Sequence, residues 1–198
     1  MIKKSIFYIS ILLTVAFISS GFKPFKSQLN DKFGIDEDNY INLNIPFTAK
    51  YFIGFKEAIA HKESQGKYHK INTLGYLGKY QFGMETLKSI GINDSVAFLK
   101  SPKLQEKAFV VLLSKNKYEL QDYINDFEGK IIDGVKITES GILAAAHLGG
   151  SGSVKRFLNS NGEKKCKDEY GASVKSYMKD FGGFETSGIK AIKNAQVK

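Results

Sequence analysis

Between residues 48 and 181 the apolar side chains recur three and four residues apart, in several segments separated by residues that cap or break helices. Such spacing places apolar side chains on one face of a helix. One other stretch, residues 127–137, combines two β-prone runs with the Asp133-Gly134 dipeptide, which favours a tight hairpin turn. The sequence therefore predicts a mainly α domain with a small β-hairpin.

The first predicted helix begins after Thr48, which we take as its N-cap, and ends at Gly66. This span places Glu63 in the last helical turn. Residues 66–83 then carry four glycines among polar and aromatic residues, a pattern more typical of an ordered loop or a small irregular sheet than of a helix.

A long apolar-rich helix is predicted to follow Ser101-Pro102, because serine favours the N-cap and proline the first helical position. We expect it to run through Tyr118 as a buried central helix. Thr138 is expected to cap an apolar helix that Gly149 or Gly150 ends. Shorter helices are predicted at residues 84–90 and 154–158, and a final amphipathic helix over residues 174–181.

The length of 198 residues suits one domain, and 42% hydrophobic with 25% charged residues is ordinary globular composition. Lysines precede an apolar run at residues 6–18, so residues 1–21 are predicted to be a signal peptide. The run is shorter than a typical membrane span, but no Ala-x-Ala cleavage triplet follows it, so an uncleaved N-terminal anchor is the alternative. We expect a spacer at 22–46, the folded domain at 47–185 and a loose basic tail at 186–198.

The formal net charge of +9 favours polyanionic partners: nucleic acid, an anionic membrane surface or acidic cell-wall polymer. Export to the periplasm, the cell envelope or the extracellular space counts against nucleic acid, and any membrane contact is expected only through the anchor. Cys166 is the single cysteine, which excludes an internal disulfide and a cysteine-based zinc cluster. His61 and His69 flank Glu63 without a His-Glu-x-x-His pattern, so we expect no metal and no cofactor.

Three short elements occur in order along the chain: Glu-Ser-Gln-Gly at residues 63–66, Leu-Gly-Tyr-Leu-Gly-Lys-Tyr-Gln-Phe-Gly at 74–83, and Ala-His-Leu-Gly-Gly at 146–150. Together they resemble the signature of lytic transglycosylases in the lysozyme-like superfamily, nearest to a variant group with these second and third elements. The resemblance covers roughly residues 55–184. It departs from the common pattern where Tyr80 replaces a frequent methionine and His147 replaces an asparagine.

The resemblance implies a lysozyme-like α+β domain that acts on peptidoglycan glycan strands as a monomer. It implies Glu63 as the catalytic acid. It also implies a set of substrate-binding residues: Ser64, Gly78, Tyr80, Gln81, His147 and Tyr177.

Elementary chemistry supports several of these roles independently. An acid that protonates a glycosidic oxygen must stay protonated near neutral pH, and the negative end of a helix dipole disfavours an ionised carboxylate. Gln81 offers both a donor and an acceptor to an N-acetyl group. Tyr80 offers a flat face to a sugar ring, whereas we expect Phe82 to belong to the core. His147 is more typical of a structural hydrogen-bonding group than of a proton carrier.

Three functions remain open from the sequence. The first is a lytic transglycosylase that cleaves the β-1,4 bond between N-acetylmuramic acid and N-acetylglucosamine with one glutamate and leaves 1,6-anhydro ends. The second is a hydrolytic muramidase of the goose-lysozyme type, in which water replaces the C6 hydroxyl. The third is a non-catalytic wall-binding module.

Overall fold

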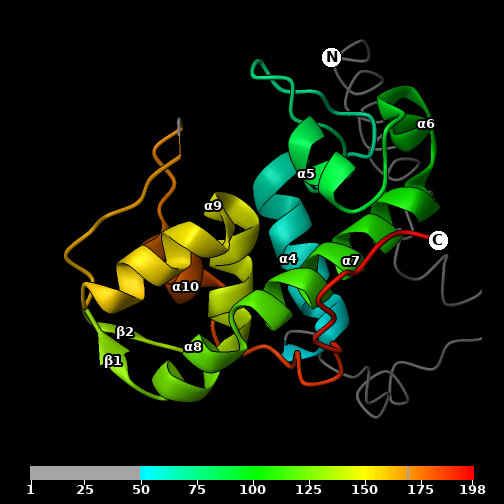
Figure 1. The fold of residues 1–198 in the computed structure, drawn as a ribbon. Helices are drawn as coiled ribbons and strands as arrows, with labels where there is room; N and C mark the ends of the chain where they lie inside the picture. Colours follow the sequence, from blue (N-terminus) through cyan, green and yellow to red (C-terminus); the bar gives the residue numbers. More distant parts are fainter. Residues whose placement is uncertain (1–49, 169) are drawn as a thin grey trace, which may run out of the picture. The chain divides into compact units, whose positions relative to one another are not determined.

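The computed structural model describes residues 50–168 and 170–198. The predicted signal peptide or anchor (1–21) and the spacer (22–46) lie outside these residues. The described part is mainly helical, with one small antiparallel sheet, as predicted (Figure 1). Its elements are α4 (Phe52–Ser64), α5 (Met84–Ser89), α6 (Ser95–Lys100), α7 (Pro102–Glu119), α8 (Gln121–Phe127), β1 (Ile131–Ile132), β2 (Val135–Lys136), α9 (Glu139–Asn159) and α10 (Val174–Asp180). Among the described residues no helix is both long and apolar enough to cross a membrane.

Helix α4 presents Glu63 from its last turn, as predicted. The helix ends at Gln65, which adopts a left-handed conformation (φ 60°), and the N–H groups of Gln65 and Gly66 donate to carbonyls in the last turn. The start differs from the prediction. The N-cap is Tyr51, without a side-chain cap, and the predicted cap Thr48 lies outside the described residues.

Helix α7 starts as its sequence predicts. The Ser101 hydroxyl accepts a hydrogen bond from the Leu104 N–H at 3.2 Å, and Pro102 occupies the first helical position. One face of the helix is buried, including Ala108 and Phe109, and packs against α9. The exposed Tyr118 shows that the far end of α7 reaches the surface, so only part of this helix is central.

Helix α9 packs mainly against α10 and α7. Thr138 accepts a hydrogen bond from the Gly141 N–H at 3.1 Å, which confirms the predicted cap. A Cβ at Gly141 would lie 2.6 Å from the Met178 carbonyl oxygen, so a glycine permits the close approach of α10. Gly150, at φ 74° and ψ 163°, breaks the helix where the sequence predicts its end, and a second helical segment continues to Asn159.

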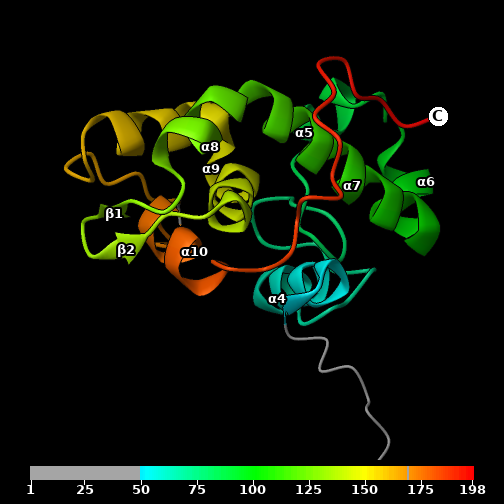
Figure 2. The same cartoon turned by 90° about the horizontal axis from the view of Figure 1, so that it is seen from below.

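The predicted hairpin forms with Ile131 opposite Lys136 and Ile132 opposite Val135. Both turn residues have positive φ, 47° at Asp133 and 74° at Gly134, as a two-residue type I′ turn requires. Strand β2 contacts α10, and the hairpin can be followed beside α10 in Figure 2.

Two helices and the packing of the C-terminal segment were not predicted. Asp94 caps α6 through its side chain, and α8 follows α7 directly. The basic tail was expected to be loose, but Ile189 and Ala195 are buried, and the N–H groups of Ile192 and Val197 donate to carbonyls of the domain. The expectation was wrong because the apolar residues between the lysines pack onto the domain.

A group of charges joins α4 and α7 to the loop at residues 66–83. The Glu106 carboxylate on α7 accepts hydrogen bonds at 2.6 to 2.9 Å from four side chains: Lys56, Tyr68, Lys79 and Tyr80. Burial opposes ionisation, but hydrogen bonds from the two lysines and two tyrosines outweigh it and lower the pKa of Glu106 to about 2. This ion cluster fixes the loop to the helical core.

Replacement of Glu106 by glutamine should lower the free energy of unfolding by about 2 kcal/mol at neutral pH, because it leaves the buried Lys79 with Glu57 alone. The pKa of Glu106 is about 2 in the folded protein, against 4.5 ordinarily, so its contribution is present above pH 4.5 and is lost as the pH falls toward 2. Urea unfolding of wild type and Glu106→Gln across this range measures the difference.

The matched control is Glu85→Gln, which removes an exposed ion pair with Lys88 and should cost under about 0.5 kcal/mol. If the two variants lose equal amounts of unfolding free energy, the stabilising role of the ion cluster is contradicted.

Candidate functional site

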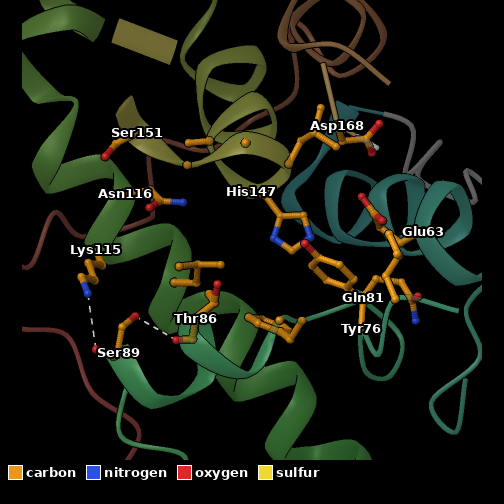
Figure 3. Close-up of a pocket in the computed structure, with 18 of the residues that line it drawn as sticks. Glu63, Tyr76, Gln81, Thr86, Ser89, Lys115, Asn116, His147, Ser151 and Asp168 are labelled. Atoms are coloured by element: carbon orange, nitrogen blue, oxygen red, sulfur yellow. Dashed lines mark hydrogen bonds between the residues drawn. The ribbon is translucent and has the colours of Figure 1, made fainter. Parts of the chain in front are cut away.

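A cleft of about 440 Å³ opens between α4, the loop at residues 66–83, α5, α7, α9 and the segment around Asp168. Figure 3 shows its walls: Glu63, Tyr76 and Gln81 lie toward one end, Lys115, Asn116 and Ser151 toward the other, and His147 stands between them. The cleft therefore combines residues from segments that are distant in the sequence.

Glu63 is partly buried at one end of the cleft. The Tyr177 hydroxyl, from α10, donates a hydrogen bond to Glu63 Oε1 at 2.6 Å. Burial raises the pKa of Tyr177, and the charge of Glu63 raises it further, so the phenol keeps its proton for this bond. The bond fixes the carboxyl group, whose Oε2 has no hydrogen-bond partner among the described residues.

His147 is neutral at neutral pH. Burial lowers the pKa of His147, while the nearby charge of Glu63 opposes that shift. Its Nε2 lies 2.9 Å from the Tyr80 carbonyl oxygen, which can only accept, so Nε2 carries the proton and Nδ1 is left as an acceptor. This geometry agrees with a positioning group that offers a lone pair at the cleft wall.

Gln81 lines the cleft at the end of a tight turn. The backbones of Leu77 and Phe82 hydrogen-bond to each other in both directions, at 2.9 and 2.8 Å, and Gln81 adopts φ 48° between them. Its Nε2 donates to the Gly78 carbonyl oxygen at 2.8 Å, which leaves Oε1 unpaired. The turn therefore orients the amide as an acceptor.

Three buried side-chain polar atoms lack a hydrogen-bond partner within the described part of the chain: Gln81 Oε1, Asn116 Nδ2 and His147 Nδ1. All three belong to residues that line this one cleft. An unpaired buried polar group costs about 1–3 kcal/mol, so a ligand that supplies two donors and one acceptor would gain binding energy here. The cleft is suited to a polar, hydrogen-bonding ligand.

Three predicted substrate-binding residues have other roles. The Tyr80 ring is fully buried and stacks on Phe109 with ring centres 4.0 Å apart, so the prediction that it faces a sugar is wrong. The Ser64 hydroxyl is buried and donates to the Lys79 carbonyl oxygen at 2.7 Å. Gly78 does not line the cleft either. These residues support the loop from behind, whereas Tyr76 presents a half-exposed ring at the wall.

The contribution of α7 to the cleft was not predicted from the sequence. Leu112, Lys115, Asn116 and Glu119 line the cleft, and their spacing of three, four and seven residues places them on one helical face. That spacing was visible in the sequence, but the same face could equally have met solvent. Asp168 also lines the cleft and was not predicted to belong to the site.

No group of three or more histidine, cysteine or acidic side chains in the described residues is placed to hold a metal ion. Comparison of the chain with protein-family models found no match. Searches of curated proteins and of solved structures also found no significantly similar protein.

The loop behind the cleft depends on Gly78. A Cβ at this position would lie 2.2 Å from Gln105 Oε1, and φ is 76°. Gln105 cannot move aside easily, because it is fully buried and its Oε1 and Nε2 hydrogen-bond to backbone groups. Gly78→Ala should lower the free energy of unfolding by about 3 kcal/mol.

Gly75→Ala is the matched control, since φ is 82° there but nothing lies within 4 Å of the added carbon. Backbone strain alone should lower the free energy of unfolding of Gly75→Ala by about 1 kcal/mol. Chemical unfolding of the two variants compares them, and a Gly78→Ala protein as stable as Gly75→Ala would refute the packing argument.

Proposed function

We propose that this protein is a lytic transglycosylase that cleaves the β-1,4 bond between N-acetylmuramic acid and N-acetylglucosamine in peptidoglycan, with Glu63 as its catalytic residue. The observation that carries the proposal is the Glu63 carboxyl group, held by Tyr177 in a cleft whose lining residues include three with buried, unpaired hydrogen-bonding atoms. A lysozyme-like relationship, suggested by the three sequence elements, belongs to the same proposal.

One carboxyl group can serve both steps of this reaction. Glu63 gives its proton to the glycosidic oxygen as the C1–O bond breaks, and the substrate's own N-acetyl oxygen bonds to C1. The Glu63 carboxylate then takes the proton of the C6 hydroxyl, O6 bonds to C1, and the N-acetyl oxygen leaves. Glu63 ends protonated, as it began, and no water is consumed.

The orientation of Glu63 suits this double role. The Tyr177 hydroxyl occupies Oε1, so Oε2 is the oxygen that can carry and recover the proton. Gln81 Oε1 and His147 Nδ1 are unpaired acceptors of residues that line the cleft, and they can hold the N–H and hydroxyl groups of the sugar beside Glu63. Holding the reacting groups in place in this way can contribute several kcal/mol to catalysis.

Hydrolysis is the second candidate, favoured by Asp168. Its carboxylate also lines the cleft, and its charge acts, like that of Glu63, on Tyr177. A second carboxylate near the acid could activate a water molecule, as in inverting glycosidases. The enzyme would then be a muramidase of the goose-lysozyme type.

Digestion of isolated peptidoglycan sacculi by the purified full chain, with mass spectrometry of the products, separates the two reactions. We expect 1,6-anhydro ends, which are lighter than hydrolytic ends by one water molecule. Glu63→Gln should lower the rate on the order of 1000-fold, because it removes both the acid and the base. Glu85→Gln, an exposed control, should leave the rate unchanged. A Glu63→Gln protein with full activity would overturn the proposal, and binding without cleavage would favour a wall-binding module.

Asp168→Asn tests the hydrolytic candidate. Asp168 Oδ1 accepts hydrogen bonds from the N–H groups of Tyr170 and Ala172, and an asparagine oxygen can keep both, so the segment should retain its shape. If the reaction is the lyase, the rate should change by no more than a few-fold. A loss on the order of 100-fold, together with hydrolytic ends, would instead identify Asp168 as the base.

A further inference from the structure

The end of the cleft that lies away from Glu63 is lined by a different set of polar residues. Lys115 and Asn116 reach it from α7, and Ser151 reaches it from the start of the second segment of α9 (Figure 3). Gly150 breaks α9 immediately before Ser151. The first N–H groups of the following nine-residue segment therefore have no carbonyl acceptors in a preceding helical turn. That helix start carries partial positive charge.

Asn116 is the best-defined feature of this end. The residue is only 6% exposed and lines the cleft, yet its Nδ2 has no acceptor among the described residues. A buried donor of this kind is normally paired, so an acceptor on a ligand is the natural partner. The donor therefore selects for an oxygen atom.

Lys115, the preceding residue of α7, contributes a positive charge to the same end of the cleft. Among the described residues that line the cleft it is the only lysine or arginine. Its Nζ forms one long hydrogen bond, 3.4 Å to the Ser89 carbonyl oxygen, and no carboxylate among the described residues lies within ion-pair distance of it. A partly buried and unneutralised cation attracts an anion more strongly than an exposed one.

We propose that this end of the cleft is a subsite for a carboxylate carried by the ligand, bound by Lys115 and Asn116. The inference rests on the proposed function, because it assigns the carboxylate to the peptidoglycan strand bound by Glu63. Two sources share this chemistry. One is the lactyl carboxylate of N-acetylmuramic acid without a peptide, and the other is a carboxylate of the attached peptide.

Glu119 is the opposing charge at this end. It lies four residues beyond Lys115, is exposed, and accepts a hydrogen bond from the Ser151 hydroxyl at 2.6 Å. Because water screens an exposed carboxylate, Glu119 weakens the attraction of Lys115 for an anion without cancelling it. Neutral substitutions of Lys115 and of Glu119 should therefore have opposite effects on the affinity for an anion.

Binding is measured with the full chain carrying Glu63→Gln, so that no turnover occurs, by calorimetry at low salt. The three probes are a chitin oligomer without carboxylates, a peptide-free N-acetylmuramic acid–N-acetylglucosamine oligomer, and the same oligomer with its peptides. Adding Lys115→Gln should weaken binding of a carboxylate-bearing oligomer about tenfold and leave the chitin oligomer unchanged. Glu119→Gln should strengthen the same interaction about twofold.

The two carboxylate-bearing probes identify the source. If Lys115→Gln weakens binding of the peptide-free oligomer, the bound group is the lactyl carboxylate. If it weakens binding of the peptide-bearing oligomer alone, the bound group is a carboxylate of the peptide. Lys103→Gln, an exposed lysine of the same helix outside the cleft, is the matched control and should change nothing. A shift of the Asn116 side-chain amide signal in NMR spectra on binding provides a second readout.

The subsite proposal is overturned if Lys115→Gln weakens all three probes equally or none of them, or if Glu119→Gln weakens carboxylate binding. The proposed function fails separately, if wild type leaves sacculi uncleaved while the carboxylate-dependent binding persists. Absence of binding by every probe overturns both.

Discussion

The geometry of the cleft depends on one partly buried carboxylate that lies outside it. Glu106 binds Lys79 and Tyr80, two consecutive residues of the loop at 66–83, and so ties that loop to α7. The backbone of the same two residues supports the cleft: the Lys79 carbonyl oxygen accepts from Ser64, next to Glu63, and the Tyr80 carbonyl oxygen accepts from His147. An ion cluster of this kind adds modest net stability but strongly restricts alternative arrangements when every member is paired.

Signals that act within a few residues made much of the fold predictable. Ser101 and Thr138 cap helices, and Asp133-Gly134 forms the hairpin turn, because each of these effects depends only on neighbouring backbone. Glu63 was placed correctly in the last turn of its helix for the same reason. The Asp94 cap of α6 is an equally local signal, although α6 was not predicted.

Which side chains face the cleft depends instead on segments that are distant in the sequence. Tyr80 was predicted to face a sugar, yet its ring stacks on Phe109 and its hydroxyl binds Glu106, both on α7. Asn116 looked like any polar residue of a helix, and only the position of α9 makes its unpaired amide part of a cleft wall. A local pattern cannot distinguish these outcomes, because contacts between residues far apart in the chain decide them.

The charges within the cleft oppose the charge of the whole chain. The chain carries a net +9, whereas the described residues contribute three carboxylates (Glu63, Asp168 and Glu119) and one lysine to the cleft lining. Surface lysines can attract an anionic polymer over a distance of about 10 Å, the screening length in moderate salt. In the proposed reaction positive charge develops on the sugar as the C1–O bond breaks, and carboxylates around that atom stabilise it. The proposed function therefore assigns the two effects to different groups: lysines outside the cleft attract the polymer, and carboxylates inside it stabilise the transition state.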